Sequence, residues 1–262
     1  MDTFEYLTEY YSNSDEDGRL ASRHGQVEFL TTMRYIEKHL SPGVRILEIG
    51  AGTGRYSHAL ARKGFDVTAV ELIQHNLDAL NAKTERGETL TALQGNALDL
   101  SLLQNNEFYI TLLLGPMYHL YTEEDQRRAL SEALRVTKRG GMLFTAYCVS
   151  DASIIDFGFK KGHIWELIER KVLDTEQFKA LSQPVDLFQL YRQNDIDRLM
   201  AGLPAERLHY VATDLWTNHM SETVDAMDDA TFDFYLKYHF AMCEREDLVG
   251  LTHHSLDIVR KL

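Results

Sequence analysis

Apolar residues recur in two distinct rhythms over the first 150 positions of the chain. From Gln26 to Leu40 they return every three or four residues, which predicts a helix with one apolar face. The residues on that face are Phe29, Met33, Ile36 and Leu40. Ser41-Pro42-Gly43 is expected to end this helix, because proline and glycine interrupt the helical backbone. A polar, acidic stretch at 12–19 precedes it and is expected to form a loop.

Short continuous apolar runs then alternate with helical patterns. Such runs are typical of strands that are buried on both faces of a sheet. The predicted strands are Val44–Ile49, Asp66–Val70, Thr89–Leu93, Ile110–Leu114 and Met142–Cys148. The predicted helices are Arg55–Lys63, Ile73–Ala82 and a helix from Thr122, which precedes three acidic residues, to about Thr137. This order predicts an α/β fold with a mostly parallel, doubly wound sheet and helices on both faces.

The alternation stops after Ser150. Residues 151–205 are expected to be mostly helical and to form an insertion, or lid, over the ligand edge of the sheet after strand 5. Arg207–Thr213 and His254–Val259 predict two more strands, which bring the sheet to seven, with a helix at Thr231–Cys243 between them. The expected division of the chain is therefore 1–150 for the ligand-binding half, 151–205 for the insertion and 206–262 for the C-terminal strands and helix.

A glycine-rich turn carries the strongest chemical signal. The run Leu47-Glu48-Ile49-Gly50-Ala51-Gly52-Thr53-Gly54 joins the first strand to a helix. Glycines at such a turn let bare backbone approach a ligand, and the following helix directs its N-terminus to the same place. A phosphate-binding P-loop is excluded because Arg55 follows Gly54 where that motif needs lysine. The glycine spacing of dinucleotide enzymes places Arg55 at the third glycine, which weakens that alternative but leaves it open.

The turn resembles motif I of class I S-adenosylmethionine-dependent methyltransferases. That family has an acidic residue two places before the first glycine, as Glu48 is here, and another at the end of the second strand, where this chain has Glu71. A carboxylate there can accept hydrogen bonds from both hydroxyls of a ribose. Because dinucleotide enzymes use an acid in the same place, Glu71 alone does not separate the two classes.

The resemblance covers residues 26–148 and implies a Rossmann-like fold with S-adenosyl-L-methionine as cofactor. Asn96 stands where the family often has an acidic residue facing the adenine, and departs from that pattern. The implied cofactor contacts are Glu48, Gly50, Ala51, Gly52, Thr53, Gly54, Glu71, Leu72, Asn96, Ala97, Leu114 and Gly115.

The segment Gly115-Pro116-Met117-Tyr118-His119-Leu120 follows the fourth strand. It is similar to a Gly-Pro-x-Tyr-His-Leu run in bacterial methyltransferases that act on small molecules. Tyr118 offers an aromatic wall that favours a cationic sulfonium, and His119 is a candidate base or a loop anchor. Both are the candidate catalytic residues, although alignment alone can accelerate methyl transfer. The expected acceptor contacts are Tyr11, Tyr118, His119 and Tyr147.

Other aromatic and basic residues are weaker candidates for the acceptor site. They are Tyr10, Arg23, His24, His163, Trp165, Tyr191, Trp216 and His219. No metal is expected, since His253-His254 has no acid or cysteine ligand at a suitable spacing and is interpreted as part of a solvated loop.

Composition restricts the partners. The formal net charge of −13 argues against a general nucleic-acid binder, because such proteins need a basic face. The two cysteines do not suggest a disulfide framework, and neither a signal peptide nor a membrane span is evident, so a cytoplasmic location is expected.

The prediction is methyl transfer to a small-molecule acceptor by an enzyme whose oligomeric state the sequence leaves open. Three alternatives remain: a nicotinamide-dependent oxidoreductase, a methyltransferase acting on macromolecules and a non-catalytic protein that binds S-adenosylmethionine. Neither the acceptor nor the methylated atom follows from the sequence.

Overall fold

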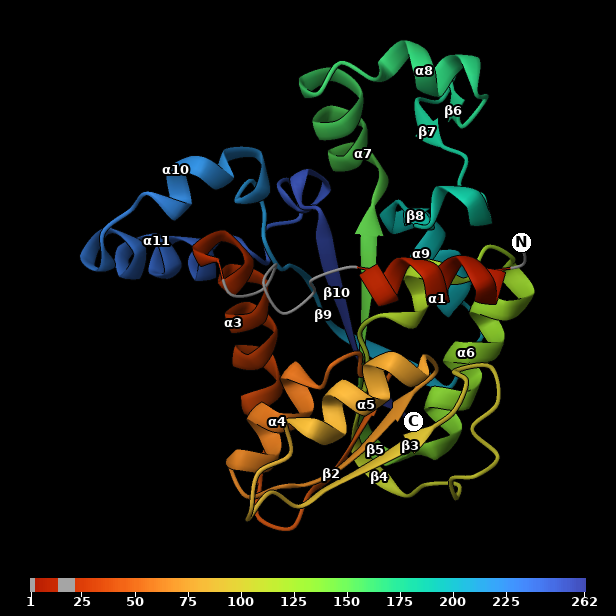
Figure 1. The fold of residues 1–262 in the computed structure, drawn as a ribbon, viewed down its shortest axis with the longest axis vertical. Helices are drawn as coiled ribbons and strands as arrows, with labels where there is room; N and C mark the ends of the chain where they lie inside the picture. The colour runs from red at the N-terminus through yellow and green to blue at the C-terminus, as the bar shows by residue number, and fades with distance from the viewer. Residues whose placement is uncertain (1–2, 14–21) are drawn as a thin grey trace.

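A central sheet organises the computed structural model, which describes residues 3–13 and 22–262 (Figure 1). Its strands are β1 Arg45–Ile49, β2 Asp66–Glu71, β3 Leu90–Gln94, β4 Phe108–Leu113, β5 Thr137–Val149, β8 Leu190–Tyr191, β9 Ala205–Ala212 and β10 His254–Lys261. The order along the sheet is β3-β2-β1-β4-β5-β10-β9, and β8 pairs with the end of β5. β10 runs antiparallel to both of its neighbours, β5 and β9, and the other strand pairs of this sheet are parallel. The mostly parallel α/β prediction is confirmed, but the short β8 makes eight strands instead of seven.

Helices cover both faces of the sheet. They include α3 Arg23–Glu37, α4 Arg55–Arg62, α5 Gln74–Ala82, α6 Glu123–Val136, α9 Gln193–Met200, α10 Ser221–Asp225 and α11 Asp229–Met242. Helices α3 and α4 pack on one face, while α6 and α9 pack on the other. The α6 cap agrees with its sequence signal, since the Thr122 hydroxyl accepts a hydrogen bond from the backbone amide of Asp125.

Burial on both faces explains why the strands have continuous apolar runs. Ile46 and Leu47 are neighbours on β1, so their side chains point to opposite faces of the sheet. Ile46 packs in the cluster with α3 and α4, and Leu47 packs in the cluster with α6 and α9. Both are fully buried. A parallel strand in this position therefore shows no alternation of apolar and polar residues.

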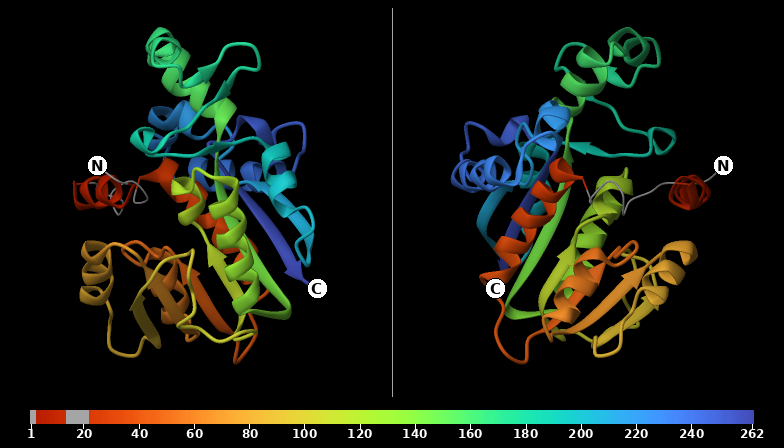
Figure 2. Two further views of the ribbon diagram at one scale, coloured as in Figure 1. Left: turned by 90° about the vertical axis from the view of Figure 1, so that its right-hand side faces the viewer. Right: turned by 60° about the vertical axis from the view of Figure 1, so that its left-hand side comes forward.

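The segment between β5 and α9 is less helical than expected. It starts with α7 Ser150–Ser153, a π-helix (η2) at Ile154–Lys160 and α8 Ile164–Glu169. A two-stranded sheet follows, made of β6 Leu173–Asp174 and β7 Lys179–Ala180. Figure 2 shows the first part of this segment projecting from the main body of the protein. The prediction of a mostly helical segment was wrong for this hairpin and for β8, which form through pairing that helical periodicity does not reveal.

The N-terminal part begins with α1 Thr3–Asn13, so the predicted loop at 12–19 was wrong for its first two residues. Residues 14–21 lie outside the described part of the chain. At the other end, α10 and α11 pack beside α3, where Val27 contacts Val224 and Phe232. In the described residues, no helix combines the length and the apolar character that a membrane crossing requires.

Candidate functional site

A cavity of about 480 Å³ opens at the C-terminal ends of the parallel strands. The loops after β1, β2, β3 and β4 line it, and α1 contributes Leu7 and Tyr11. Residues of α3, β5 and the start of β10 complete its wall. Ligands of open α/β sheets bind at this edge, where the strand order reverses.

Two glycines of the turn after β1 have different roles. Gly50 has a φ of +71°, and a Cβ there would lie 2.6 Å from Cδ of Pro116. Its missing side chain lets the turn pack against η1 Pro116–His119, the short helix after β4. Gly52 has a φ of +55° and no atom within 4 Å of an added Cβ. Because Gly52 lines the cavity, its bare backbone leaves that space open to a ligand.

Glu71 ends β2 beside the glycine turn. One carboxylate oxygen accepts hydrogen bonds from the amide of Ile73 at 2.9 Å and from Asn76 at 3.4 Å, and the other accepts from the amide of Gly52 at 2.8 Å. Burial raises the pKa of this carboxyl, while the hydrogen bonds from the two amides oppose that rise. A carboxylate has about four acceptor positions, so capacity remains for ligand hydroxyls.

The structure brings eleven of the twelve predicted cofactor residues to the cavity wall. They are Glu48, Gly50, Ala51, Gly52, Thr53, Glu71, Leu72, Asn96, Ala97, Leu114 and Gly115. Gly54 is the exception, because it precedes α4 and an added Cβ would lie 2.8 Å from Cγ of Leu80. Its role is to allow α4 and α5 to approach each other. Glu48 accepts a hydrogen bond from the Ser57 hydroxyl, and burial raises its pKa to about 8.

His119 lines the cavity, but both of its ring nitrogens are engaged. Nδ1 lies 2.8 Å from the carbonyl oxygen of Leu187, and Nε2 lies 2.8 Å from the hydroxyl of Tyr11. A carbonyl only accepts, so Nδ1 carries the proton and Nε2 accepts from Tyr11. Burial lowers the pKa of His119 to about 4, against a smaller opposing effect of the Leu187 hydrogen bond. A neutral histidine that joins α1 to the segment at Leu187 is better suited to holding the loop than to accepting a substrate proton.

We expect nitrogen-15 NMR of the histidine rings to show His119 as the Nδ1-protonated tautomer, titrating at a pH near 4. The variant Tyr11→Phe removes the hydrogen bond donated to neutral Nε2, so the pKa of His119 should rise. Titration of His119 near its ordinary value in the unmodified protein, or an Nε2-protonated tautomer, would contradict this assignment.

Tyr147 lies outside the cavity, which corrects its prediction as an acceptor contact. Its side chain is fully buried on the opposite face of β5, with its ring 5.0 Å from that of Tyr191. The neighbouring Ala146 lines the cavity instead. Alternation along a strand sends successive side chains to opposite faces, so an error of one position reverses the assignment. Tyr118 and Tyr11, the other predicted aromatic contacts, do line the cavity.

None of the eight weaker candidates lines the cavity. Arg23 pairs with Asp229 at 2.6 Å and His24 pairs with Asp225 at 2.7 Å, so both fasten α3 to the C-terminal helices. Trp165 is 73% exposed on the projecting segment. The remaining candidates that do not line the cavity are Tyr10, His163, Tyr191, Trp216 and His219.

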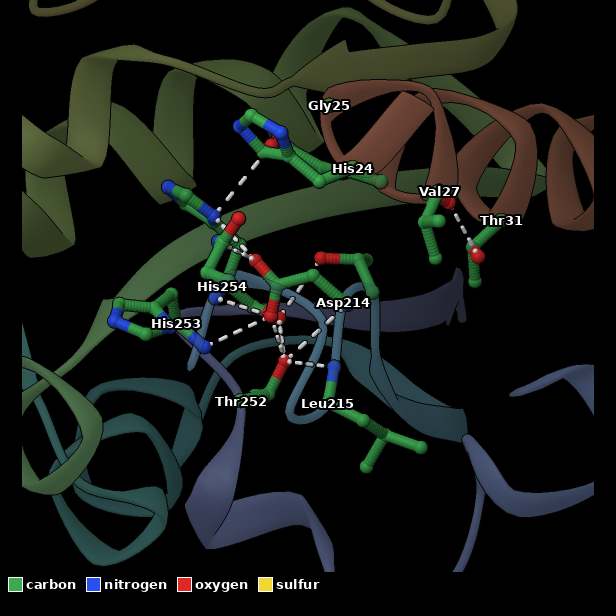
Figure 3. Close-up of polar contacts among 12 residues, drawn as sticks. His24, Gly25, Val27, Thr31, Asp214, Leu215, Thr252, His253 and His254 are labelled. Carbon is green, nitrogen blue, oxygen red and sulfur yellow. Dashed lines mark hydrogen bonds and ion pairs between the residues drawn. The ribbon is translucent and has the colours of Figure 1, made fainter. Parts of the chain in front are cut away.

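Two acids that the sequence did not single out, Glu28 and Asp214, lie beside His254. Glu28 and His254 line the cavity, and Asp214 pairs with His254 (Figure 3). Nδ1 of His254 is 2.8 Å from Asp214 and 3.5 Å from Glu28. His254 begins β10 and is in an ion pair, so the interpretation of His253-His254 as a solvated loop was wrong. The acids of this group stand 40 and 226 positions from His254 in the chain, where no local spacing could reveal them.

Asp214 holds His254 through a dense set of contacts. Its carboxylate accepts from the Thr252 hydroxyl, from the amide of His253 at 2.8 Å and from Asn218 at 2.8 Å. Burial opposes the charge of Asp214, but the hydrogen bond from His254 and the charge of that ring keep its pKa below the ordinary value. Burial alone would lower the pKa of His254, yet Glu28 and Asp214 outweigh it and raise that pKa well above the ordinary value. Both carboxylates therefore favour the protonated form of His254.

Residues 46–141 match a family described as "Methyltransferase domain". Demethylmenaquinone methyltransferase of Renibacterium salmoninarum is 34% identical, over 40% of this chain and 41% of that protein. Glycine/sarcosine N-methyltransferase of Aphanothece halophytica is 30% identical, over 46% of each chain. The chain thus spans less than half the length of these curated relatives. A Thermotoga maritima structure described as a "SAM-dependent methyltransferase, possible histamine N-methyltransferase" has a TM-score of 0.60 at 17% identity and covers both chains fully.

Residues 46–141 therefore match a methyltransferase domain, and S-adenosylmethionine is the cofactor of methyltransferases of this fold. The wall of the cavity fits that cofactor, since Gly52 leaves space for it and the Glu71 carboxylate lies beside Gly52. The family match favours the methyltransferase interpretation over the oxidoreductase alternative.

Gly52→Val is expected to weaken S-adenosylmethionine binding by at least about tenfold, because its methyl groups would project into the cavity. A valine at positive φ also costs about 1–3 kcal/mol of folding free energy. Gly43→Val is the matched control, since Gly43 has a φ of +81°, equally open surroundings and no place in the cavity. Calorimetric titration and urea unfolding of both variants should show similar strain but a binding loss only for Gly52→Val. Equal binding by the two would contradict the placement of Gly52.

Proposed function

We propose that this protein transfers the methyl group of S-adenosylmethionine to a small-molecule acceptor. One observation carries the proposal: a single cavity is lined by the glycine turn and Glu71 and also by the polar side chains of Glu28 and His254. Two of its similar proteins carry the names of small-molecule methyltransferases, one for demethylmenaquinone and one for glycine or sarcosine. The Gly115–Leu120 segment further supports a place in the bacterial subgroup that shares this run.

The cofactor supplies an electrophilic methyl group on a sulfonium, and the protein's part is to position the acceptor. Alignment of two reactants in a binding site can contribute about 7–11 kcal/mol to a reaction. Tyr118 is 9% exposed and lines the cavity, where its ring favours a cation. His119 is proposed to position this loop through Tyr11 and Leu187, in place of the catalytic role expected from the sequence.

We propose that the segment 184–188 acts as the cover of the cavity. Pro184 lines it, and the carbonyl of Leu187 accepts hydrogen bonds from His119 and from the Tyr121 hydroxyl. The ring of Phe188 packs against His119 and Tyr10. This cover joins the segment after β5 to α1, which excludes water from the reacting groups. The lid function expected for residues 151–205 is therefore assigned to this short part of it.

A cytoplasmic location accompanies the proposal. Both cysteines are free and buried, which agrees with a reducing compartment. The formal net charge of −13 disfavours nucleic acid as the acceptor.

The proposal is tested by calorimetric titration of the purified protein with S-adenosylmethionine, with S-adenosylhomocysteine and, in parallel, with NAD. Micromolar binding of the first two and none of NAD is the expected result. Incubation with methyl-labelled S-adenosylmethionine and a cell extract should then place the label in the small-molecule fraction. Binding of NAD alone would refute the proposal, and label in protein or nucleic acid would change the acceptor class. Cofactor binding without any transferred label would favour a non-catalytic binding protein.

A further inference from the structure

Two histidine rings and one carboxylate meet between the projecting segment and the loops that follow β9 and precede β10. They are Asp156 on η2, His219 on the short helix η4 Asn218–Met220 and His253, which directly precedes β10. Each offers one ligand atom, and the three atoms lie within 4.8 Å of one another. None of the three residues lines the cavity, so this group is separate from the candidate methyltransferase site.

The ring of His219 is held by one nitrogen and presents the other to a ligand. Its Nε2 lies 3.1 Å from the carbonyl oxygen of Leu251. A carbonyl only accepts, so Nε2 carries the proton, and Nδ1 of the neutral ring has a lone pair. Within the described part of the chain, this Nδ1 is buried and has no hydrogen-bond partner. A backbone carbonyl that accepts from the second nitrogen is the usual support of a metal-binding histidine.

His253 presents a second nitrogen of this kind. Its ring centroid lies 4.5 Å from that of His219, and its Nδ1 is likewise buried with no hydrogen-bond partner among the described residues. Buried polar atoms in folded proteins nearly always have a partner, so two such nitrogens on neighbouring imidazoles require a physical reason. A metal ion between the rings would supply it, because each neutral imidazole can direct a lone pair at the ion.

Asp156 supplies the negative charge of the group. Its side chain is 16% exposed, and its carboxylate pairs with Lys161 at 2.7 Å and with Lys160 at 3.5 Å. Both lysine side chains are more than half exposed, so these pairs are weak and can be exchanged for another cation. Lys160 also donates a hydrogen bond to the carbonyl of His219 at 2.9 Å, which keeps η2 beside η4.

We propose that Asp156, His219 and His253 bind one Zn²⁺ ion, which fastens the projecting segment to the start of β10. Imidazole nitrogens and a carboxylate oxygen are typical zinc ligands, at about 2.0–2.2 Å from the ion. Three ligand atoms of a tetrahedral site stand about 3.4 Å apart at such distances, so small side-chain rotations bring this group to the ion. Water occupies the fourth position, since all three residues are partly exposed.

The local spacing around His253 predicts no metal site, because Asp156 and His219 lie 97 and 34 positions away in the chain. Only the fold brings the three together. Among the described residues, one other group of three possible ligands includes His254. The Nδ1 of His254 already lies 2.8 Å from Asp214, so that nitrogen is used by an ion pair. The unpartnered nitrogens therefore favour the group at His253.

The first test titrates the metal-free protein with Co²⁺, which has visible absorption bands in tetrahedral sites, and then with Zn²⁺. One Co²⁺ per chain should bind with a tetrahedral spectrum, and Zn²⁺ should abolish that spectrum by displacing it. Zn²⁺ at about a hundredfold above its dissociation constant should raise Tm by about 5–10 °C. Absence of saturable binding, or binding that leaves Tm unchanged, would overturn the proposal.

Variants then identify the ligands. His219→Ala, His253→Ala and Asp156→Asn should each weaken Zn²⁺ binding by at least about tenfold, because each removes one of three protein ligands. His163→Ala is the matched control: His163 is 43% exposed on the same segment and pairs with Glu166 at 3.0 Å, and it belongs to no group of three possible ligands among the described residues. Unchanged affinity in the three ligand variants, or an equal loss in His163→Ala, would also overturn the proposal. Urea unfolding of every variant without metal separates a lost ligand from a lost fold.

Discussion

Asp214→Asn is expected to lower the free energy of unfolding by about 3–5 kcal/mol, the usual cost of removing one partner of a buried ion pair. The asparagine oxygen can still accept from Thr252 and from the amide of His253. Its amide group, however, would face His254 Nδ1 and Asn218, both of which are donors. The variant therefore leaves a buried imidazolium without its principal counter-ion.

The pH dependence of this loss has a definite sign. His254 holds the pKa of Asp214 below its ordinary value despite burial. The contribution of Asp214 to the free energy of unfolding is therefore present above about pH 3.9, and it is lost as the pH falls through the folded-state pKa. Glu28 and Asp214 raise the pKa of His254 despite burial. The contribution of His254 to the free energy of unfolding is therefore present below about pH 6.5, and it is lost as the pH rises through the folded-state pKa. The deficit of Asp214→Asn should be largest between these limits.

Urea unfolding at pH 6 and at alkaline pH measures both the size and the sign of this effect. Asp229→Asn is the control, because Asp229 pairs with Arg23 at the surface with its side chain 93% exposed. Such a pair contributes at most about 1 kcal/mol. Similar losses for the two variants, or a deficit for Asp214→Asn that grows with pH, would show that the buried pair does not stabilise the fold in this way.

Glu71→Ala is expected to weaken S-adenosylmethionine binding by about 1.5–3 kcal/mol, or roughly 10–150-fold, as the loss of hydrogen bonds to a charged group predicts. The variant removes both the acceptor for ligand hydroxyls and the anchor of the Gly52 and Ile73 amides. The free energy of S-adenosylmethionine binding should fall more than the free energy of unfolding, because the cavity lets water reach the freed amides.

The measurement is calorimetric titration of the variant with S-adenosylmethionine, accompanied by urea unfolding. Asn76→Ala should lose less S-adenosylmethionine binding than Glu71→Ala, because Asn76 donates a hydrogen bond to Glu71 at 3.4 Å and also lines the cavity. Glu85→Ala is the control at the surface, where Glu85 pairs with Arg62 at 2.9 Å. A binding constant for Glu71→Ala within about twofold of the original would remove Glu71 from the cofactor site.

The cofactor end of the site was accessible to sequence reasoning because its parts are local. Gly50 and Gly52 lie within one turn, and Glu71 ends the next strand, so the alternation of strand and helix already places them at one edge. Gly54 was assigned to the same site because it continues the two-residue spacing of Gly50 and Gly52. Only the tertiary structure shows that Gly54 lacks a side chain to make room for Leu80, and not for a ligand.

The group of Glu28, Asp214 and His254 was not accessible in this way. Glu28 comes from the first helix of the sheet domain, Asp214 follows β9, and His254 begins β10, the strand that runs antiparallel between β5 and β9. Their meeting depends on the order in which the last two strands join the sheet. His119 shows the same limit, because its neutral state follows from contacts with Tyr11 and Leu187, which lie 108 and 68 positions away.

The sequence by itself determined the α/β class, the glycine turn and the acid at the end of β2, since periodicity and turn chemistry act between near neighbours. The tertiary structure decided which face each side chain occupies, as Ala146 and Tyr147 show. It also decided which charges pair. Charge pairing and desolvation depend on distances in space. The order of the 262 residues does not reveal the distances between residues that lie far apart in the chain.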